Sequence, residues 1–271
     1  EVINRLEARA GLSGYPFLKA YVKEKNNEDA SIDLTFNLTN GPKLYVERID
    51  IKGNTQTLDR VVRREFSFSE GDPFNPVLLK KTEEKIRALG FFEKTELSVK
   101  EGSSDQSAIV SVQLEEAPTG SLNFGAGFST DTKVSGTISL SENNFLGRGQ
   151  RLKVEAFGSA TNTSVGFGFT EPAFLNRDLS ASIDINFTDI EPNESSYSSN
   201  SSSISTGFGF MVGPDSRVNA SYEYEQEKLV VPLTSTSKVL KSESGKLSKG
   251  KLAVAFSRDG RNSIIEPTAG Y

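Results

Sequence analysis

The fold of the second half of this 271-residue chain is decided by one stretch, Leu122-Asn123-Phe124-Gly125-Ala126-Gly127-Phe128. Side chains alternate between the two faces of a strand, so Leu122, Phe124, Ala126 and Phe128 share one face. The other face receives an asparagine and two glycines, which are small and uncharged. A strand packed on a soluble core usually carries charged side chains on its polar face. An apolar outer face with a small, weakly polar inner face is typical of a transmembrane barrel.

The same alternation recurs about eight times between residues 119 and 271. The predicted strands centre on residues 122–128, 134–140, 152–156, 165–169, 179–187, 207–212, 218–224 and 252–256. We expect each to have about nine to eleven residues, the length of a tilted membrane strand. Residues 191–203, which are rich in serine, and residues 231–244 are predicted long loops, whereas residues 213–215 form a tight turn. Short turns at one edge and long loops at the other are typical of membrane barrels.

The residues before Pro118 follow a different pattern. A strand over 45–51 is followed by a helix that begins near Thr57, its predicted N-cap, and by a second helix that begins at Asn75-Pro76. Two strands, 92–99 and 109–114, complete a strand-helix-helix-strand-strand unit. Residues 1–42 predict a helix and strands at 17–25 and 32–38, which match the last three elements of that unit. We therefore expect a tandem repeat, present in part in residues 1–42 and completely in residues 43–118.

Composition excludes several function classes. The chain contains no histidine and no cysteine, so it lacks the commonest catalytic base, the commonest metal ligand and any thiol nucleophile. Its net charge of -5 gives no support for a nucleic-acid partner. Glu223, Glu225 and Glu227 share a strand face and could imitate a metal or acid-base cluster, but a solvated face is favoured because Lys228 lies nearby. We expect no catalytic residues, no metal site and no cofactor.

Four motifs resemble those of a known family. Leu89-Gly90-Phe91-Phe92 resembles the signature of POTRA domains, the periplasmic repeats of the outer-membrane barrel-assembly family. Asn143-Asn144-Phe145-Leu146-Gly147-Arg148-Gly149 and Thr170-Glu171-Pro172-Ala173-Phe174 resemble the motifs after that family's second and fourth barrel strands. Ser257-Arg258-Asp259 followed by 267–271 resembles the approach to the ninth. The order and spacing of the four motifs together are specific, and the resemblance covers essentially the whole chain.

The resemblance implies an α+β POTRA module followed by about the first half of an antiparallel transmembrane β-barrel of the 16-stranded type. Residues 1–42 would be the C-terminal part of one POTRA repeat, 43–118 the complete membrane-proximal POTRA domain and 119–271 the first eight or so strands. It also implies a fragment of a longer protein in the outer membrane of a Gram-negative bacterium, with its POTRA region in the periplasm. The implied partners are unfolded outer-membrane barrel precursors, accessory assembly lipoproteins and the lipid bilayer.

The implied activity is assembly without chemical catalysis, by pairing an incoming strand with an open strand edge. In the family the first barrel strand pairs weakly with the last and forms a lateral gate. The matching residues here are Leu122, Asn123, Phe124, Gly125, Ala126, Gly127 and Phe128. Gly125 and Gly127 would weaken this strand and suit a seam that opens. Equally, glycines could simply suit the wall of a small barrel, since the fourth and sixth strands carry the same alternation of glycine and phenylalanine.

A second candidate site is a POTRA strand expected at a sheet edge, which could hold an extended client or a partner lipoprotein. Its residues are Phe92, Glu93, Lys94, Thr95, Glu96, Leu97, Ser98 and Val99. The alternative is an edge that Glu93, Lys94, Glu96 and Lys100 protect from pairing.

Two other functions stay open. One is a polypeptide-translocating pore of the same superfamily, of the two-partner secretion or organelle import type. The other is a soluble β-sandwich or lipocalin-like binding protein, which would carry charged residues on the polar strand faces. Four of the predicted strands lack such charges.

Overall fold

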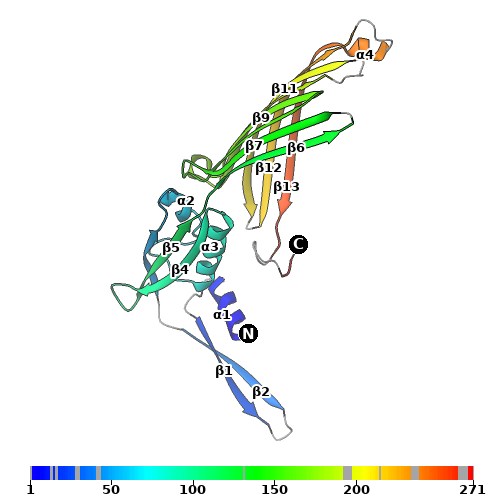
Figure 1. The fold of residues 1–271 in the computed structure, drawn as a ribbon. Helices are drawn as coiled ribbons and strands as arrows, with labels where there is room; N and C mark the ends of the chain where they lie inside the picture. Colours follow the sequence, from blue (N-terminus) through cyan, green and yellow to red (C-terminus); the bar gives the residue numbers. More distant parts are fainter. Residues whose placement is uncertain are drawn as a thin grey trace. The chain divides into compact units, whose positions relative to one another are not determined.

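The computed structural model describes residues 2–12, 15, 18–27, 31–40, 44–130, 132–191, 197–213, 215–232, 238–261 and 268–270. The described residues up to Ala117 form one compact unit, and those from Pro118 onward form a second (Figure 1). The first is a POTRA-like α+β module and the second is an eight-stranded antiparallel sheet, which confirms the predicted fold class.

The first unit begins with a helix and a hairpin. Helix α1 (Val2–Leu12) precedes strands β1 (Leu18–Asn26) and β2 (Ile32–Asn40), which pair antiparallel with Leu18 opposite Asn40 and Asn26 opposite Ile32. The apolar side chains of β2 are exposed, at 58% for Ile32 and 53% for both Leu34 and Leu38. An apolar row of this kind ordinarily packs on a core.

A complete strand-helix-helix-strand-strand unit follows. Its elements are β3 (Tyr45–Lys52), α2 (Asp59–Arg63), α3 (Pro76–Ala88), β4 (Phe92–Glu101) and β5 (Ser107–Glu116). The sheet order is β3-β5-β4, with β3 parallel and β4 antiparallel to the central strand β5. The order of elements predicted from the sequence is confirmed.

Both helices of this unit pack on the sheet. Val61 and Val62 of α2, Ile86 of α3, and Val110 and Val112 of β5 are all completely buried in one cluster. Their removal from water is the main favourable term in folding this unit. The core therefore lies between the sheet and the two helices.

The start of α3 was predicted correctly, but the start of α2 was not. The Asn75 side chain accepts a hydrogen bond of 2.9 Å from the N–H of Val77, and Pro76 occupies the first turn of α3. Helix α2 instead begins after Leu58, with no side-chain cap. Thr57 is buried, and its N–H donates to the Glu116 carboxylate at 2.6 Å, a contact that local sequence does not reveal.

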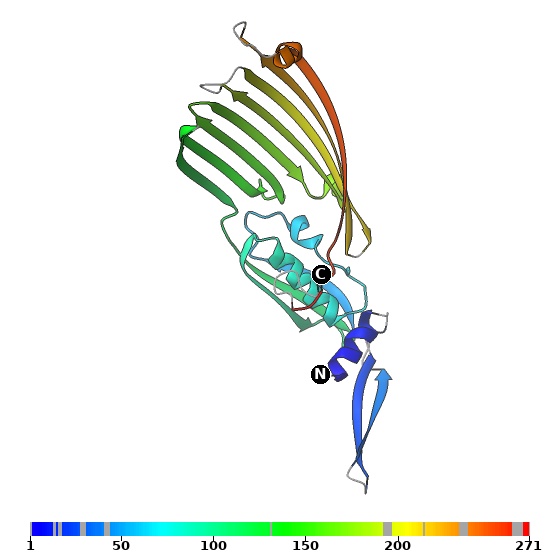
Figure 2. The same ribbon diagram turned by 90° about the vertical axis from the view of Figure 1, so that its right-hand side faces the viewer.

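The second unit is a single meander, in which each strand pairs with its sequence neighbours. The strands are β6 (Gly120–Ser129), β7 (Lys133–Phe145), β8 (Gln150–Ser159), β9 (Asn162–Glu171), β10 (Leu179–Ile190), β11 (Ser198–Gly213), β12 (Ser216–Val230) and β13 (Gly245–Arg258). A 3-10 turn, η1 (Phe174–Asn176), lies between β9 and β10, and α4 (Lys238–Glu243) lies between β12 and β13. The sheet is strongly curved (Figure 2).

Two sequence predictions about this sheet were wrong. Strand β11 begins at Ser198, inside the predicted serine-rich loop, because backbone pairing with β10 and β12 continues through the serines. Strands β7, β10, β11, β12 and β13 have 13, 12, 16, 15 and 14 residues, longer than the expected nine to eleven. At the edge where β6 ends, the connections after β6 and β8 are short and those after β10 and β12 are longer.

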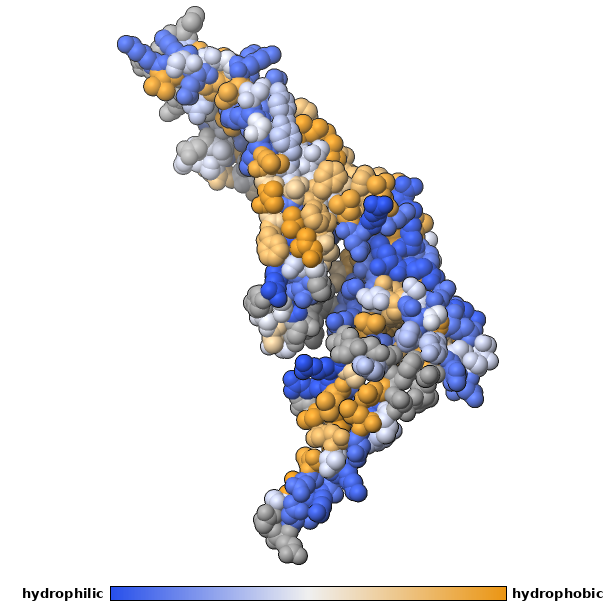
Figure 3. Space-filling model, turned by 180° about the vertical axis from the view of Figure 1, so that it is seen from behind, coloured by the Kyte–Doolittle hydropathy of each residue, from blue (hydrophilic) through white to orange (hydrophobic). Residues whose placement is uncertain are grey.

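The two faces of the sheet differ in chemistry. Outward residues such as Phe124, Phe128 and Leu252 are 74%, 77% and 74% exposed. In Figure 3 apolar residues gather in a band over these strands, and hydrophilic residues lie beyond the band toward α4. The opposite face carries serine, glycine, asparagine and a few charges.

None of the helices in the described part of the chain is long and apolar enough to span a membrane.

Candidate strand-pairing edges

Strand β6 forms one edge of the large sheet. It pairs antiparallel with β7, from Gly120 opposite Glu142 to Ser129 opposite Lys133, and with no other strand among the described residues. All ten of its residues are exposed. The opposite edge is β13, whose fourteen residues are also exposed. Unpaired backbone N–H and C=O groups at such an edge can template another strand. The predicted gate residues 122–128 therefore all lie on an open edge.

The start of β6 is held by side chains as well as by its backbone ladder. The Glu142 carboxylate accepts hydrogen bonds from the Thr119 hydroxyl and, at 2.7 Å, from the N–H of Asn144. The hydroxyls of Ser121 and Ser141 lie 2.8 Å apart across the pair of strands. Sequence reasoning missed Glu142, because its partners are Thr119 in the linker before β6 and Asn144 near the end of its own strand.

The far end of β6 has fewer such contacts. A Cβ atom at Gly125 would meet only the Thr137 side chain, at 3.7 Å, whereas at Gly127 it would lie 3.1 Å from the Ser135 hydroxyl. Gly125 thus leaves space that a larger residue could fill, and Gly127 packs closely on its neighbour. Glycine lowers the stability of a strand because it loses more backbone freedom and packs no side chain. The edge strand is accordingly held at its start by Glu142 and at its end by the bonds between Ser129 and Thr132, and it is supported least around Gly125.

The POTRA sheet also has two edges, and one is closed. Beside β3, the N–H of Val46 donates to the Asp72 carbonyl at 2.9 Å and the N–H of Gly71 donates to the Val46 carbonyl at 2.7 Å. Farther along, the Glu70 carboxylate accepts from the N–H of Ile49 at 3.0 Å, and Arg63 donates to the Ile49 carbonyl at 3.2 Å. These contacts occupy the groups that another strand would need.

The other edge, β4, lies where the sequence predicted it, and it carries features that oppose pairing. Its register with β5 is interrupted between Phe92 and Lys94. The exposed Lys94 and Glu96 form an ion pair of 3.1 Å, and Arg87 of α3 donates to the carbonyl of Thr95 at 3.2 Å. A bulge and charged side chains are common means of protecting an edge. An extended client would have to displace Arg87.

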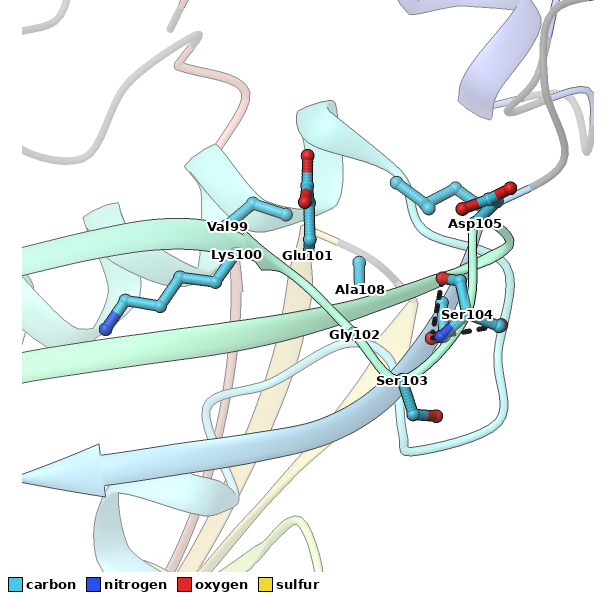
Figure 4. Close-up of a pocket in the computed structure, with 10 residues that line it drawn as sticks. Val99, Lys100, Glu101, Gly102, Ser103, Ser104, Asp105 and Ala108 are labelled. Atoms are coloured by element: carbon cyan, nitrogen blue, oxygen red, sulfur yellow. Dashed lines mark hydrogen bonds between the residues drawn. The ribbon is translucent and has the colours of Figure 1, made fainter.

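A shallow hollow of about 420 Å³ lies beyond the end of β4, lined by Val99, Lys100, Glu101, Ser103, Asp105 and Ala108 among others (Figure 4). The turn beside it is well ordered by hydrogen bonds. Glu47 accepts from the N–H of Ser103 at 2.6 Å, and this bond, with those from the Ser107 and Ser103 side chains, lowers the pKa of Glu47. Ser104 donates its N–H to the Ser107 hydroxyl at 2.9 Å. These contacts indicate a structural turn.

The glutamates of β12 are paired with lysines of β13. Lys249 lies 2.7 Å from Glu227 and Lys251 lies 3.8 Å from Glu223, on the polar face of the sheet. Among the residues that the structure describes, there is no group of three or more side chains placed to hold a metal ion. The interpretation of these glutamates as a solvated charged face agrees with the observed ion pairs.

Comparison with known families matches both units. Residues 144–271 match the sequence model of the Omp85 superfamily domain. Residues 44–117 match the POTRA model, described as a surface antigen variable number repeat. The chain belongs to the Omp85 superfamily. Members of this superfamily are non-enzymatic and sit in the outer membrane, with their POTRA domains in the periplasm.

Relatives of this Omp85 chain are named as assembly factors. It is 28% identical, over 95% of its length, to the outer membrane protein assembly factor BamA of Nitratidesulfovibrio vulgaris, and covers 32% of that protein. It is 31% identical to the BamA of Neorickettsia risticii over 62% of its length, covering 23% of that relative. This Omp85 chain thus spans a third or less of the length of these two curated relatives.

Solved structures show the same fold. BamA from Haemophilus ducreyi lacking POTRA domains 1–3 aligns with a TM-score of 0.71 at 23% identity, covering 99% of the Omp85 chain and 54% of that structure. CdiB from Acinetobacter baumannii aligns with a TM-score of 0.57 at 14% identity, covering 95% and 50%. At these identities the two structures support the fold alone.

Proposed function

We propose that this chain is part of an outer-membrane protein assembly factor of a Gram-negative bacterium, which folds and inserts β-barrel proteins by strand templating at β6. The single observation that supports the proposal best is that β6, the first strand, pairs among the described residues with β7 alone and so has its other side free for a further strand. It ends a sheet with one apolar and one polar face, so a strand added to it would continue both faces. The proposed gate comprises Leu122 to Phe128.

The support of β6 on its β7 side fits this proposal. Glu142 and Ser141 hold its first residues, and the Ser129 hydroxyl bonds to the hydroxyl and the N–H of Thr132 in the turn to β7. The proposed gate is therefore the other side of β6, where the final strand can separate while the β6–β7 ladder stays in place. Each newly exposed N–H and C=O group would be satisfied by an incoming strand, since an unsatisfied group in the bilayer costs about 2–7 kcal/mol.

The test uses the full-length protein in lipid vesicles and the folding rate of a heat-modifiable barrel client. The native protein should accelerate folding over empty vesicles, and crosslinking residues 122–128 to the final barrel strand should abolish the acceleration. A crosslink between β7 and β8 is the matched control and should leave the rate unchanged. Equal rates with and without the gate crosslink would overturn strand templating at β6.

A translocating pore is the second candidate, and the apolar outer face of the large sheet favours it over a soluble β-sandwich. A pore would pass ions or an extended polypeptide and would not accelerate client folding. Ion conductance together with unchanged client folding in the same vesicles would favour this function.

We further infer that residues 1–42 are the end of a POTRA repeat that precedes the domain at 43–118, and that the barrel begins near residue 119. In β5 the alternating residues Ala108, Val110, Val112 and Leu114 are buried, whereas the equivalent apolar row of β2 is exposed. The apolar row of β2 therefore resembles the core-facing side of a strand on which, among the described residues, no other element packs. Unfolded barrel precursors and accessory lipoproteins are the partners we propose, with β4 as a candidate surface once Arg87 is displaced.

A further inference from the structure

Two turns at the same edge of the large sheet repeat one sequence. The connection from β7 to β8 contains Phe145-Leu146-Gly147-Arg148, and the connection from β9 to β10 contains Phe174-Leu175-Asn176-Arg177. Strands run in alternate directions, so both connections lie at the edge where β6 begins. The chain enters the sheet there directly after the POTRA unit. This edge is therefore the periplasmic one in an Omp85 protein.

The two turns also share a backbone conformation. Leu146 and Gly147 have φ of 54° and 68°, and Leu175 and Asn176 have φ of 57° and 56°. In each turn the N–H of the arginine donates to the carbonyl of the phenylalanine at 3.2 Å. Positive φ at both central residues is the pattern of a type I′ turn, which strongly favours asparagine, aspartate or glycine.

Leucine is an unfavourable residue at the first central position. The left-handed conformation costs a residue with a Cβ atom about 1–2 kcal/mol. Packing does not explain the choice, because Leu146 and Leu175 are 67% and 70% exposed. Strained backbone that recurs in matched places is a reason to look for a function.

The surroundings of the second turn indicate what the leucines contact. The ring of Phe174 packs edge-on against Phe208, with centroids 6.3 Å apart, and Phe208 belongs to the apolar face. This turn therefore lies on the rim of the apolar face, and Leu175 continues that face beyond the strand ends. The residue two positions later is an exposed arginine in both turns. Within the described residues, neither Arg148 nor Arg177 makes a side-chain hydrogen bond or an ion pair.

We propose that Leu146 with Arg148 and Leu175 with Arg177 are two matched anchors for the periplasmic leaflet of the membrane. Each leucine enters the acyl chains near their glycerol end, and each arginine binds the phosphate of a phospholipid headgroup. An apolar side chain beside a long cationic one suits this boundary, since the cation can extend to the headgroups while its stem stays in apolar surroundings. The anchors would fix the depth of this edge in the bilayer.

The proposal rests on the outer-membrane placement of the sheet and not on strand templating. The test uses the full-length protein in vesicles of phosphatidylethanolamine and phosphatidylglycerol. Single cysteines carrying an environment-sensitive fluorophore replace Leu146 or Leu175, with Val254→Cys on the apolar face and Asn219→Cys on the polar face as controls. Quenchers are lipids brominated near the glycerol end of the acyl chains, and aqueous iodide.

Labels at 146 and 175 should be quenched by the shallow bromines and little by iodide, whereas a label at 219 should be quenched by iodide. Quenching by iodide at 146 and 175 equal to that at 219 would overturn the proposal. Protection from both quenchers would also overturn it, because it would mean that protein covers the turns. A label at 254 tests membrane placement separately, and client folding tests the gate.

A double variant, Leu146→Asn with Leu175→Asn, separates anchoring from turn stability. Asparagine suits the left-handed conformation, so heat-modifiable folding should be kept or improved. Quenching of a label at Asp178 by the shallow bromines should nevertheless fall about two-fold. Arg148→Gln with Arg177→Gln should remove the dependence of this quenching on phosphatidylglycerol, tested against phosphatidylcholine vesicles. Unchanged quenching in the double asparagine variant would contradict the role of the leucines, and a retained lipid dependence would contradict that of the arginines.

Discussion

The backbone N–H of Thr57 donates a hydrogen bond of 2.6 Å to the carboxylate of Glu116, although 59 residues separate the two in the chain. The same carboxylate accepts from the N–H of Gln56 at 2.9 Å and from the Thr55 hydroxyl at 2.6 Å. Glu116 is the last residue of β5, just before the linker to the large sheet. These bonds tie the end of the central POTRA strand to the loop before α2.

The Glu116 contacts predict an acid-sensitive POTRA domain. Burial by itself would raise the pKa of Glu116, but the bonds from Thr55, Thr57 and Gln56 outweigh it and lower the pKa from 4.5 to about 2. A lowered folded-state pKa stabilises the fold above the ordinary value, and this stability is lost as the pH falls from about 4.5 to about 2. Glu116→Gln should lower the free energy of unfolding by about 1–2 kcal/mol at neutral pH, allowing for solvent screening. It should also make that free energy nearly independent of pH in the acid range.

The measurement is urea unfolding of residues 44–117 as a function of pH. Glu115→Gln is the matched control, because Glu115 is exposed and makes no ion pair or side-chain hydrogen bond with the described residues. The control should unfold like the native domain at every pH. A Glu116 variant with the native pH dependence would contradict the prediction.

Two glycines with the same backbone conformation should respond very differently to alanine. Gly53 and Gly71 have φ of +90° and +91°. A Cβ atom at Gly53 would lie 1.9 Å from the Leu114 carbonyl oxygen, whereas at Gly71 it would meet nothing within 4 Å. Gly71→Ala should cost about 1–2 kcal/mol for the conformation alone. Gly53→Ala should lower the free energy of unfolding by at least about 3 kcal/mol more than Gly71→Ala, because the backbone must move to make room for the Cβ atom. Equal losses of stability for the two variants in chemical denaturation would contradict this prediction.

Local patterns made most of the fold predictable from the sequence. Alternation located all eight strands of the large sheet, and Asn75-Pro76 located the start of α3, because these signals act between near neighbours. The serine-rich start of β11 was missed because its strand structure comes from pairing with β10 and β12 and not from its own composition.

The candidate site was predictable only in part. The edge positions of β6 and β4 followed from the expected topology. The side chains that hold or block those edges could not be predicted, because they come from other elements. Glu142 of β7 contacts Thr119, and Arg87 of α3 contacts Thr95. The repeated Phe-Leu-X-Arg turns were visible in the sequence, but only the positive φ of both leucines made them notable.

Removing the carboxylate charge of Glu142 should loosen the start of β6. Glu142→Gln weakens the bonds to the Thr119 hydroxyl and the Asn144 N–H, and a hydrogen bond to a charged group contributes about 1.5–3 kcal/mol. Hydrogen exchange of the amides at 120–122 should therefore accelerate in the full-length protein. Glu155→Gln on β8 is the control, because Glu155 pairs with Lys153 along its own strand and does not contact the start of β6. Acceleration by both variants to the same degree would show a general effect of charge on the sheet.

Filling the space beside Gly125 should slow the proposed gate without disturbing the fold. Gly125→Val places a β-branched side chain near Thr137, where a Cβ atom has ordinary contact at 3.7 Å. Valine favours extended backbone, so β6 should gain up to about 1 kcal/mol as a strand and separate less readily from the final strand. The folding rate of a barrel client in vesicles should fall several-fold, by about the factor that this free energy gives. Gly158→Val is the control, because Gly158 lies on β8, which is paired on both sides, and a Cβ atom there meets nothing within 4 Å. Equal client rates for the native protein and both variants would show that the glycines of β6 merely suit the barrel wall.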